Sequence, residues 1–431
     1  MRPLLAAVLA LGVAAGVLGV SSAQAQPTPV TTWTDKADQL GNGNANWHSL
    51  AIMHMAMHDA LNAVRPIYVR WAPPRPDEPP AAGAAPQAAL EAAAATVLEG
   101  LHPDRRRDIA ALLEVRMTEV PRGPTRDEGL ALGRAIGAAT LARRSNDGFN
   151  QVLLFPGSDV PGVWRPTPPR HQSSATTRTQ PFLFAGRSTL MGVPPPEPGS
   201  PRYRADVDAV RRIGGAVSTE RTPEQTAAAI FWAYQSTQRG YVQLAATLID
   251  ADPERFDLSD QARIMSQMTA AMADAAILIW EAKERWLYWR PVDAIQSGTF
   301  NVAADPSWQS FIETPPHPEY PSGHAADCYT GAALLQATLR LAGPLTYTAQ
   351  SAPSVAVRPA EIWSSDMGMP PAPVELTPTP RRFATLQEAA RQCADARIWA
   401  GAHFPSANEE SRRIAALIVA RATAALPPLP R

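Results

Sequence analysis

The chain has 431 residues, a formal net charge of -1 and a hydrophobic fraction of 45%. A nearly neutral chain has no global field that steers it toward nucleic acid or charged surfaces, so we expect no nucleic-acid partner. The hydrophobic fraction is sufficient for a large core of one or two domains, while 44 prolines predict long irregular connections.

The N-terminus has the pattern of a secretory signal peptide. Arg2 supplies the positive end, residues 4–20 the apolar stretch, and Ala23-Gln24-Ala25 a small-residue cleavage site. An uncleaved membrane anchor is the alternative. No later apolar run reaches the length that spans a bilayer. We therefore predict that residues 1–25 are removed, and that the mature protein is secreted or periplasmic without a membrane span.

Helical periodicity dominates the predicted N-terminal helical region, residues 26–150. Apolar residues repeat at helical spacing across 50–64, and residues 85–101 form an alanine-rich helical stretch. Thr125-Arg-Asp-Glu128 has the pattern of a capping box and predicts a helix that runs to about Arg144. This region should therefore consist of helices joined by short loops.

Prolines interrupt every helical pattern between residues 151 and 201, which predicts a proline-rich arm or linker. The region 202–431 should form a helical-bundle catalytic region, with another loop at 343–381. Its predicted helices are 223–236, 239–250, 259–290, 382–401 and 407–425. Capping boxes are predicted at Thr222-Pro-Glu-Gln225 and Ser406-Ala-Asn-Glu409. Alternating strand pairs with hairpin turns are absent from the pattern, so we predict an all-α fold of helical bundles with long proline-rich loops.

Cations and histidines concentrate in three short segments, residues 283–291, 321–324 and 397–403. Lys283 is one of only two lysines among 39 basic residues, and a compact ammonium suits a tight anion site better than a guanidinium does. If the helix continues to Arg290, both cations lie on one face, two turns apart. Such a face suits an anion with several oxygens.

The second and third segments add to the same prediction. Ser322, Gly323 and His324 begin a helix, where free backbone N–H groups bind anions and glycine permits close approach. Arg397 and His403 are six residues apart and share no face of a regular helix, so we expect the intervening glycine to end or bend that helix. Together the three segments predict a pocket for a tetrahedral oxyanion.

The order Lys-x6-Arg-Pro, Pro-Ser-Gly-His and Arg-x5-His resembles the vanadium-dependent haloperoxidases and the type-2 phosphatidic acid phosphatase superfamily that shares their site. Residues 54–63 and the Trp164–Pro169 loop are also similar to secreted bacterial haloperoxidases. The resemblance implies helical bundles throughout. It also implies a set of residues that holds the oxygens of vanadate, or of phosphate in its place: Lys283, Arg290, Ser322, Gly323 and Arg397.

The same resemblance implies individual roles. His403 corresponds to the axial vanadium ligand of a haloperoxidase or the nucleophile of a phosphatase, and His324 to the acid–base residue. Trp280 and His317 correspond to the halide side, where a histidine favours bromide over chloride. Two positions depart from the family pattern: Ala396 replaces a serine, and the segment after His403 lacks the usual aspartate.

Three functions remain open at this point. A haloperoxidase would use hydrogen peroxide, a halide and a small organic acceptor. A soluble acid phosphatase would cleave phosphomonoesters through a phosphohistidine. The third possibility is a non-catalytic oxyanion-binding protein. Five-coordinate vanadate resembles a phosphoryl-transfer transition state, so the same cations serve either chemistry.

Two further pairs of side chains allow alternative interpretations. His54 and His58 are four residues apart, a spacing that can bind metal, although we expect packed histidines because no glutamate lies between them. Cys328 and Cys393 would meet an oxidising compartment after export, but the sequence does not decide whether they form a disulfide.

Overall fold

A computed structural model describes the chain from residue 26 to residue 427, with gaps. The residues outside this description are 1–25, 42–45, 152, 167–172, 175, 187–191, 234–235, 340–344, 348–355, 358–373, 376–380 and 428–431. The predicted signal peptide therefore lies outside the described residues.

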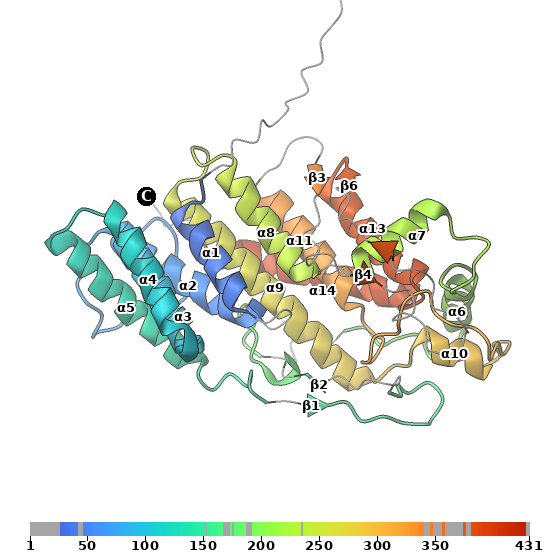
Figure 1. Ribbon diagram of the computed structural model, residues 1–431. Coiled ribbons are helices and arrows are strands. Elements are labelled where there is room, and N and C mark those ends of the chain that lie inside the picture. The colour runs from blue at the N-terminus through green and yellow to red at the C-terminus, as the bar shows by residue number, and fades with distance from the viewer. Residues whose placement is uncertain are drawn as a thin grey trace, which may run out of the picture.

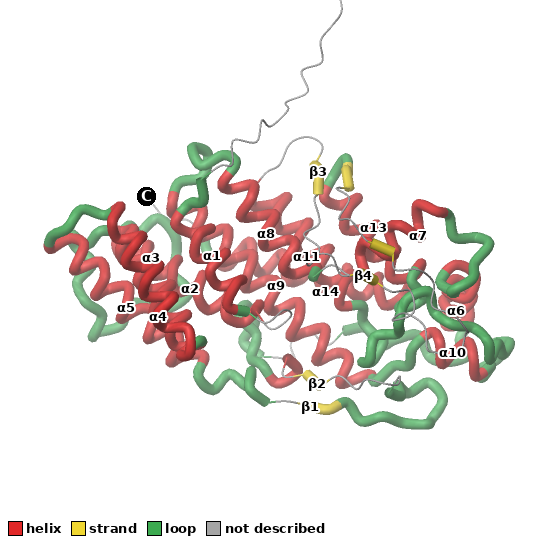
Figure 2. Tube along the Cα trace, in the orientation of Figure 1, coloured by secondary structure: helices red, strands yellow, loops and turns green. Residues whose placement is uncertain are grey.

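Helices make up most of the described structure, and Figure 2 shows that strands are few and short. The helices are α1 (Pro29–Leu40), α2 (Asn46–Val64), α3 (Pro86–Leu101), α4 (Arg106–Arg116), α5 (Pro124–Arg144), α6 (Pro201–Ile213), α7 (Pro223–Ala233), α8 (Thr237–Asp250), α9 (Leu258–Trp286), α10 (Pro291–Ser297), α11 (Gly323–Leu339), α13 (Leu386–Trp399) and α14 (Pro405–Ala425). Single turns of 3-10 helix lie at Pro103–Arg105, Met117–Glu119 and Thr176–Arg178. The predicted all-α class is confirmed.

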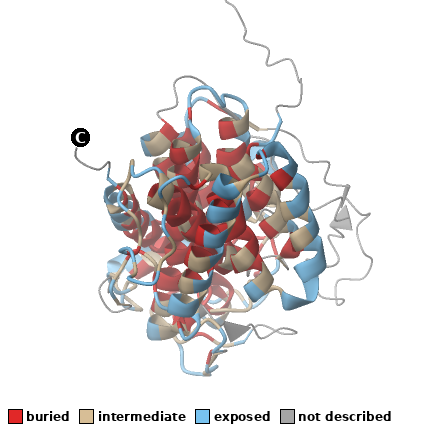
Figure 3. Ribbon diagram, turned by 90° about the vertical axis from the view of Figure 1, so that its left-hand side faces the viewer, coloured by how far each residue is buried: buried red, intermediate tan, exposed pale blue. Residues whose placement is uncertain are grey.

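Helix α9 runs through the centre of the molecule and separates two groups of helices. Figure 1 shows α1 to α5 on one side of it and α11, α13 and α14 on the other. Buried side chains of both groups belong to one continuous hydrophobic core, which includes Met53 of α2, Met268 of α9 and Leu334 of α11. Viewed from the side, this core forms the buried interior in Figure 3. Within the described ranges, none of the helices combines the length and hydropathy needed to cross a bilayer.

The predicted helix 259–290 is wrong at its C-terminal end, because α9 stops at Trp286. Leu287 adopts a left-handed conformation with φ of 43°, and the chain continues extended to Arg290, which precedes Pro291. A residue before proline disfavours helical backbone. The backbone of this extended segment is hydrogen-bonded to two distant loops. Trp164 N donates to Leu287 O at 2.6 Å, and Glu319 N donates to Tyr288 O at 2.9 Å. Tertiary pairing thus overrides the helical pattern.

The described parts of the proline-rich arm are anchored along α9, beneath it in Figure 1. The buried carboxylate of Asp274 accepts hydrogen bonds from the backbone N–H groups of Phe182 and Leu183, at 2.6 and 2.8 Å. An ion pair of 2.6 Å joins Arg178 to Glu284. These contacts fix the arm against the C-terminal half of α9, next to the predicted oxyanion segments.

The capping boxes are partly as predicted. Thr222 N donates to Gln225 Oε1 at 2.9 Å and Gln225 N donates to Thr222 Oγ1 at 3.2 Å, which confirms that box. The boxes at Thr125 and Ser406 are wrong, because Gly123 and Phe404 are the N-caps and a proline occupies the first helical position after each. Proline at that position needs no capping partner for its missing N–H.

Three short antiparallel pairs correct the expectation that the chain contains no paired strands. They are β1 (Leu153–Leu154) with β2 (Ser173–Ser174), β3 (Leu345–Tyr347) with β6 (Arg381–Phe383), and β4 (Ala356–Val357) with β5 (Val374–Glu375). Segments of two or three residues are too short to show an alternating pattern in sequence. They lie in the predicted loops, except that β6 extends into the first two residues of the predicted helix 382–401, and they do not change the fold class.

Cys328 of α11 and Cys393 of α13 form a disulfide bond. Cys328 lies one helical turn after His324, and Cys393 one turn before Arg397. The bond therefore ties together the two helices that carry the second and third oxyanion segments.

Removal of this disulfide is expected to destabilise the protein by about 4 kcal/mol, because it closes a loop of 65 residues in the unfolded chain. The measurement is denaturant unfolding of the wild type and of the Cys328→Ala/Cys393→Ala variant, with and without reductant. Equal midpoints for both proteins under non-reducing conditions would contradict the disulfide.

Candidate active site

The three predicted segments meet at one place between the C-terminal ends of α9 and α13 and the N-terminal end of α11. Lys283 lies in the last turn of α9, Arg290 is the N-cap of α10, and Ser322 immediately precedes α11. Arg397 lies in the last turn of α13, and His403 lies in the short link before α14. Lys283 and Arg290 thus converge through a chain reversal, rather than along one helical face as predicted.

Gly401 allows the chain to turn from Arg397 to His403, as the sequence predicted. Its φ is +75°, and a Cβ atom at this position would lie 2.3 Å from the carbonyl oxygen of Gly214. The backbone N–H groups of Ala402 and His403 both donate to Arg397 O, at 3.0 and 3.3 Å. This turn ends α13 and brings His403 back beside the arginine.

Arg290 is fully buried and holds the third segment and the proline loop together. Its Nη1 donates to Ala402 O at 2.6 Å and lies 3.3 Å from His403 Nε2. Its Nη2 lies 3.1 Å from His317 Nδ1, and its Nε donates to His317 O at 3.0 Å. Burial lowers the pKa of Arg290 to about 9, with Glu319 opposing that change, so the guanidinium stays charged at neutral pH.

Lys283 is also buried, and its ammonium group contacts the loop before α11. Nζ donates to the carbonyl oxygens of Pro318, Glu319 and Pro321 at 2.7, 2.9 and 2.6 Å. Burial and the charges of Arg290 and Arg397 lower its pKa, while three carbonyl acceptors match the three donors of the charged form. Lys283 therefore places a positive charge at the site while its N–H groups hold the loop.

Ser322, Gly323 and His324 form the start of α11. Ser322 is fully buried, and its carbonyl oxygen accepts from Ser411 Oγ at 2.7 Å. A Cβ atom added to Gly323 would meet nothing within 4 Å, so this backbone faces open space. His324 is partly buried, and its Nε2 is shielded from solvent without a hydrogen-bond partner. An open cradle thus lies beside an unsatisfied ring nitrogen.

Arg397 is 2% exposed and adds a third buried cation. Burial is the main cause that lowers the pKa of His324, and the charge of Arg397 is the second. The charge of Arg397 also lowers the pKa of Lys283 and of His403. These couplings bring Arg397 into the same cluster as the other two segments. The cluster therefore concentrates three cations, which favours an anionic guest.

The histidines of the cluster are held in the neutral form. Burial lowers the pKa of His403 well below its ordinary value, followed by the charges of Arg290, Lys283 and Arg397. Burial and the neighbouring cations lower the pKa of His317 and His324 in the same way. A neutral imidazole keeps a lone pair on one nitrogen, which is the form that ligates or attacks.

Trp280 and His317, the predicted halide-side residues, lie side by side. Their ring centroids are 4.9 Å apart. Phe155 of the arm stacks on Trp280, with ring centroids 5.8 Å apart. His317 Nδ1 lies 3.1 Å from the donor Arg290 Nη2 and 3.1 Å from the acceptor Pro318 O, so both groups compete for this nitrogen. The wall of the site next to Arg290 is thus aromatic and carries an imidazole.

Sequence reasoning missed Glu319, a fully buried carboxylate in the middle of the cluster. Its Oε1 lies 2.9 Å from His403 Nδ1 and accepts from Phe404 N at 2.9 Å. Burial raises its pKa to about 7, and Arg290 is the strongest influence in the opposite direction. A glutamate between two prolines forms no periodic pattern, so the sequence offered only its adjacency to Pro-Ser-Gly-His as a signal.

His54 and His58 are packed histidines, as expected, and both are fully buried. His54 Nδ1 donates to Leu50 O at 2.9 Å, and His58 Nε2 donates to Val69 O at 3.0 Å. Among the described residues, no group of three or more histidine, cysteine or carboxylate side chains could hold a metal ion. Burial lowers the pKa of each of these two histidines to about 4.

This burial predicts a loss of stability in acid. The folded pKa of about 4 lies below the ordinary 6.5, so the unfolded chain binds more protons between these values. Stability should fall as pH drops from about 6.5 to 4, by up to about 3 kcal/mol per histidine. The test compares unfolding free energies of wild type and His54→Gln across this range. The variant should lose less stability than the wild type; parallel curves would contradict the prediction.

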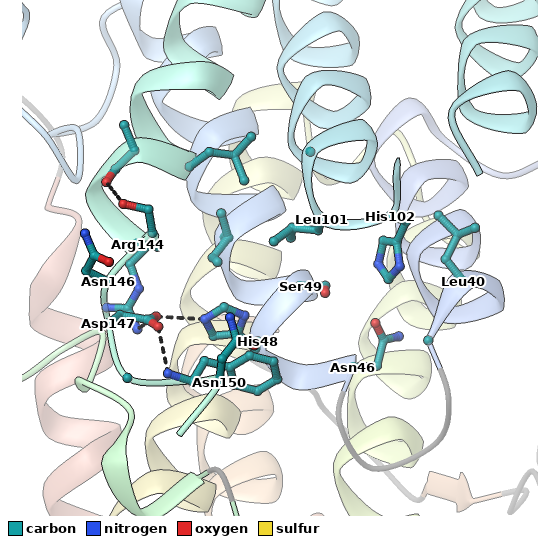
Figure 4. Close-up of a pocket in the computed structure, with 18 of the residues that line it drawn as sticks. Leu40, Asn46, His48, Ser49, Leu101, His102, Arg144, Asn146, Asp147 and Asn150 are labelled. Carbon is teal, nitrogen blue, oxygen red and sulfur yellow. Dashed lines mark hydrogen bonds and ion pairs between the residues drawn. The ribbon is translucent and has the colours of Figure 1, made fainter. Parts of the chain in front are cut away.

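A separate cavity of about 900 Å³ lies among the ends of α2, α3 and α5. Figure 4 shows His48 hydrogen-bonded to Asp147, with Nε2 2.7 Å from Oδ2. Phe149 stacks on the His48 ring, with centroids 3.9 Å apart. The described residues that line this cavity do not include any member of the oxyanion cluster.

Comparisons with known proteins agree with this geometry. Residues 263–426 match the family model of the VCPO second helical-bundle domain. Vanadium chloroperoxidase of Curvularia inaequalis is 31% identical over 147 residues, a match that covers 27% of this chain and only 24% of that protein. The chain thus spans about a quarter of the length of this curated relative.

Solved structures extend the likeness in fold to nearly the full chain. A bacterial vanadium-dependent iodoperoxidase superposes with a TM-score of 0.70 at 19% identity, covering 94% of this chain and 98% of that one. A holo-type bacterial vanadium-dependent chloroperoxidase gives a TM-score of 0.63 at 17% identity, with 93% of each chain covered. The fold is therefore that of the bacterial vanadium haloperoxidases. Within this fold, residues 263–426 also carry the sequence pattern of the VCPO second helical-bundle domain.

Proposed function

We propose that the chain is an enzyme that binds vanadate and oxidises a halide with hydrogen peroxide. The observation that carries this proposal is the convergence of three buried cations and two neutral histidines, from three distant segments, on one place. Lys283, Arg290 and Arg397 are each at most 2% exposed. The buried carboxylate of Glu319 offsets part of this charge. An excess of buried positive charge is costly, so an anionic guest that offsets the remainder best explains the cluster.

The residues fit vanadate on the evidence of the site itself. Gly323 faces open space where an oxyanion can approach the first turn of α11, whose free N–H groups favour negative charge. Nε2 of His324 is buried without a partner, so it has capacity for an oxygen of the guest. Among the described residues, Arg290 Nη1 lies 3.3 Å from Nε2 of His403, a hydrogen bond long enough for a ligand to displace.

Each residue then has a distinct task. When bound, vanadate supplies the centre at which hydrogen peroxide is activated for the two-electron oxidation of a halide. His403 would hold the group through Nε2, and His324 would give or take a proton at its own Nε2. Arg290, Arg397, Ser322 and Gly323 hold the oxygens. Lys283 contributes charge and keeps the loop before α11 in place, because its donors are engaged by that loop.

Bromide is the proposed halide. The site places the ring of His317 4.9 Å from the indole of Trp280, so an imidazole lies beside an aromatic surface. Such a surface favours a large, polarisable and weakly hydrated halide over chloride. We also propose that the product is transferred to a small organic acceptor, and that the mature enzyme acts after export, as the N-terminal pattern indicates.

The test compares halide oxidation with ester hydrolysis in three incubations of the purified protein. One incubation contains orthovanadate, hydrogen peroxide and bromide, and follows the bromination of a phenolic dye; a second replaces bromide with chloride. A third follows hydrolysis of a phosphomonoester without vanadate. Vanadate-dependent bromination that exceeds chlorination, with no ester hydrolysis, is the expected result. Ester hydrolysis without bromination would show a phosphatase, and neither reaction would show a non-catalytic protein.

A further inference from the structure

Glu319 contacts the first and third segments of the site and lies two residues before the second. Its side-chain Oε1 faces His403 Nδ1 and Phe404 N, both at 2.9 Å. Its carbonyl oxygen accepts from Lys283 Nζ at 2.9 Å, and its N–H donates to Tyr288 O at 2.9 Å. Among the described residues it therefore connects the end of α9, the loop before α11 and the link before α14.

The side-chain contact determines which nitrogen of His403 carries the proton. Glu319 Oε1 can only accept while it is ionised, and Phe404 N–H already requires an acceptor there. His403 Nδ1 must then donate to the carboxylate. On the opposite side of the ring, Arg290 Nη1 can only donate, and it lies 3.3 Å from Nε2. Both neighbours thus specify the neutral ring with the proton on Nδ1 and the lone pair on Nε2.

The carboxylate also comes from an unexpected part of the chain. Phe404 and Pro405 follow His403 and lead directly into α14. Glu319 lies 84 positions earlier in the chain, yet it is fully buried against the ring. A hydrogen-bonded carboxylate fixes ring orientation and increases the basicity of the opposite nitrogen.

We propose that Glu319 is the positioning residue for His403: it fixes the imidazole as the Nδ1–H form and directs the Nε2 lone pair to the oxyanion. The inference rests on the proposed function in so far as His403 ligates vanadate. The state of the ring itself can be measured without vanadate. Glu319 does not touch the guest, and its effect passes through His403 and through the loop that Lys283 holds.

The test uses two substitutions at this position and one matched control. In Glu319→Gln the amide oxygen still accepts from both N–H groups, because Phe404 N–H prevents the amide from turning its NH₂ inward. In Glu319→Ala both acceptors are lost. Asp274→Ala removes another fully buried carboxylate that accepts two N–H groups, but it lies on α9 against the arm. The control thus reproduces the structural damage without touching His403.

The readouts are the ring nitrogen signals of His403 in protein with nitrogen-15 histidine, and the vanadate dissociation constant from calorimetry. We expect a proton on Nδ1 in wild type and in Glu319→Gln, with dissociation constants that agree within about threefold. In Glu319→Ala the signals of both ring nitrogens of His403 should shift, and the vanadate dissociation constant should rise by about 10–100-fold. Asp274→Ala should lower the melting temperature and leave both readouts unchanged.

Two outcomes would overturn the inference. A proton on Nε2 of wild-type His403 would do so without any variant, and therefore applies even if Glu319→Ala does not fold. Unchanged vanadate binding and unchanged His403 signals in a folded Glu319→Ala would also do so, while the proposed function would stand. Conversely, a wild type that fails to bind vanadate but shows the Nδ1 proton would contradict the proposed function and support the role of Glu319.

Discussion

Replacement of His403 with alanine is expected to reduce vanadate-dependent halide oxidation by at least ~10³-fold, to the level of the protein without vanadate. The ring is 1% exposed, its Nδ1 is engaged by Glu319, and its Nε2 is the nitrogen left for the guest. Without this nitrogen the site keeps its cations but loses its ligand. The measurement is the steady-state bromination rate at increasing vanadate concentrations.

His102→Ala is the matched control for this substitution. His102 follows α3 and lines the separate cavity, so its loss should leave bromination unchanged. Alanine at 403 that retains full turnover would refute the role assigned to this histidine. A folded His403→Ala variant that binds vanadate weakly but does not catalyse bromination agrees with the assigned role of His403, because the arginines that hold the oxyanion remain.

Replacement of Lys283 with methionine is expected to destabilise the protein by roughly 3 kcal/mol or more, because three buried carbonyl groups lose their donor. Methionine has a similar length but no N–H groups. The measurement is the unfolding free energy from denaturant titration. Lys36→Met provides the control, since Lys36 is the only other lysine and lies partly exposed on α1; its loss should change stability by less than about 0.5 kcal/mol.

The same substitution should weaken vanadate binding, because it removes one of three positive charges from the site. Lys283→Arg should not restore either property, since the larger planar guanidinium does not fit the space around three converging carbonyl groups. Normal stability in Lys283→Met would show that the ammonium does not hold the loop. Normal stability and binding in Lys283→Arg would show that charge alone suffices.

The helices were predictable because each buries a face whose residues recur at helical spacing. The stretch from Pro86 to Leu101 and the capped start at Thr222 are examples in which local pattern and tertiary packing agree. The end of α9 was not predictable for the opposite reason. Residues 287–289 follow the helical pattern in sequence, but their backbone pairs with the arm at Gly162 and Trp164, and this pairing depends on distant sequence.

The composition of the candidate site followed from motifs, but its connections did not. Lys283, Arg290 and Arg397 were expected to surround one guest, and they lie in one buried cluster. Their hydrogen bonds to backbone carbonyls could not be predicted, because those carbonyls belong to the proline-rich loop, whose path has no periodicity. Glu319 escaped prediction for the same reason.

The division into regions 26–150, 151–201 and 202–431 remains a prediction. The two groups of helices share α9 and a continuous core, so the arm between them does not act as a simple flexible tether. Asp274 and Glu284 of α9 hold the described parts of the arm in place. Unfolding experiments on the whole chain would show whether the regions lose structure together.

The most direct test of the account is a crystal structure of the protein with orthovanadate. We expect vanadium density bonded to His403 Nε2, with its oxygens against Arg290, Arg397 and the start of α11. Density elsewhere, such as in the cavity beside His48, or an ordered site without vanadium at saturating concentration, would contradict the claim that the three segments bind one oxyanion.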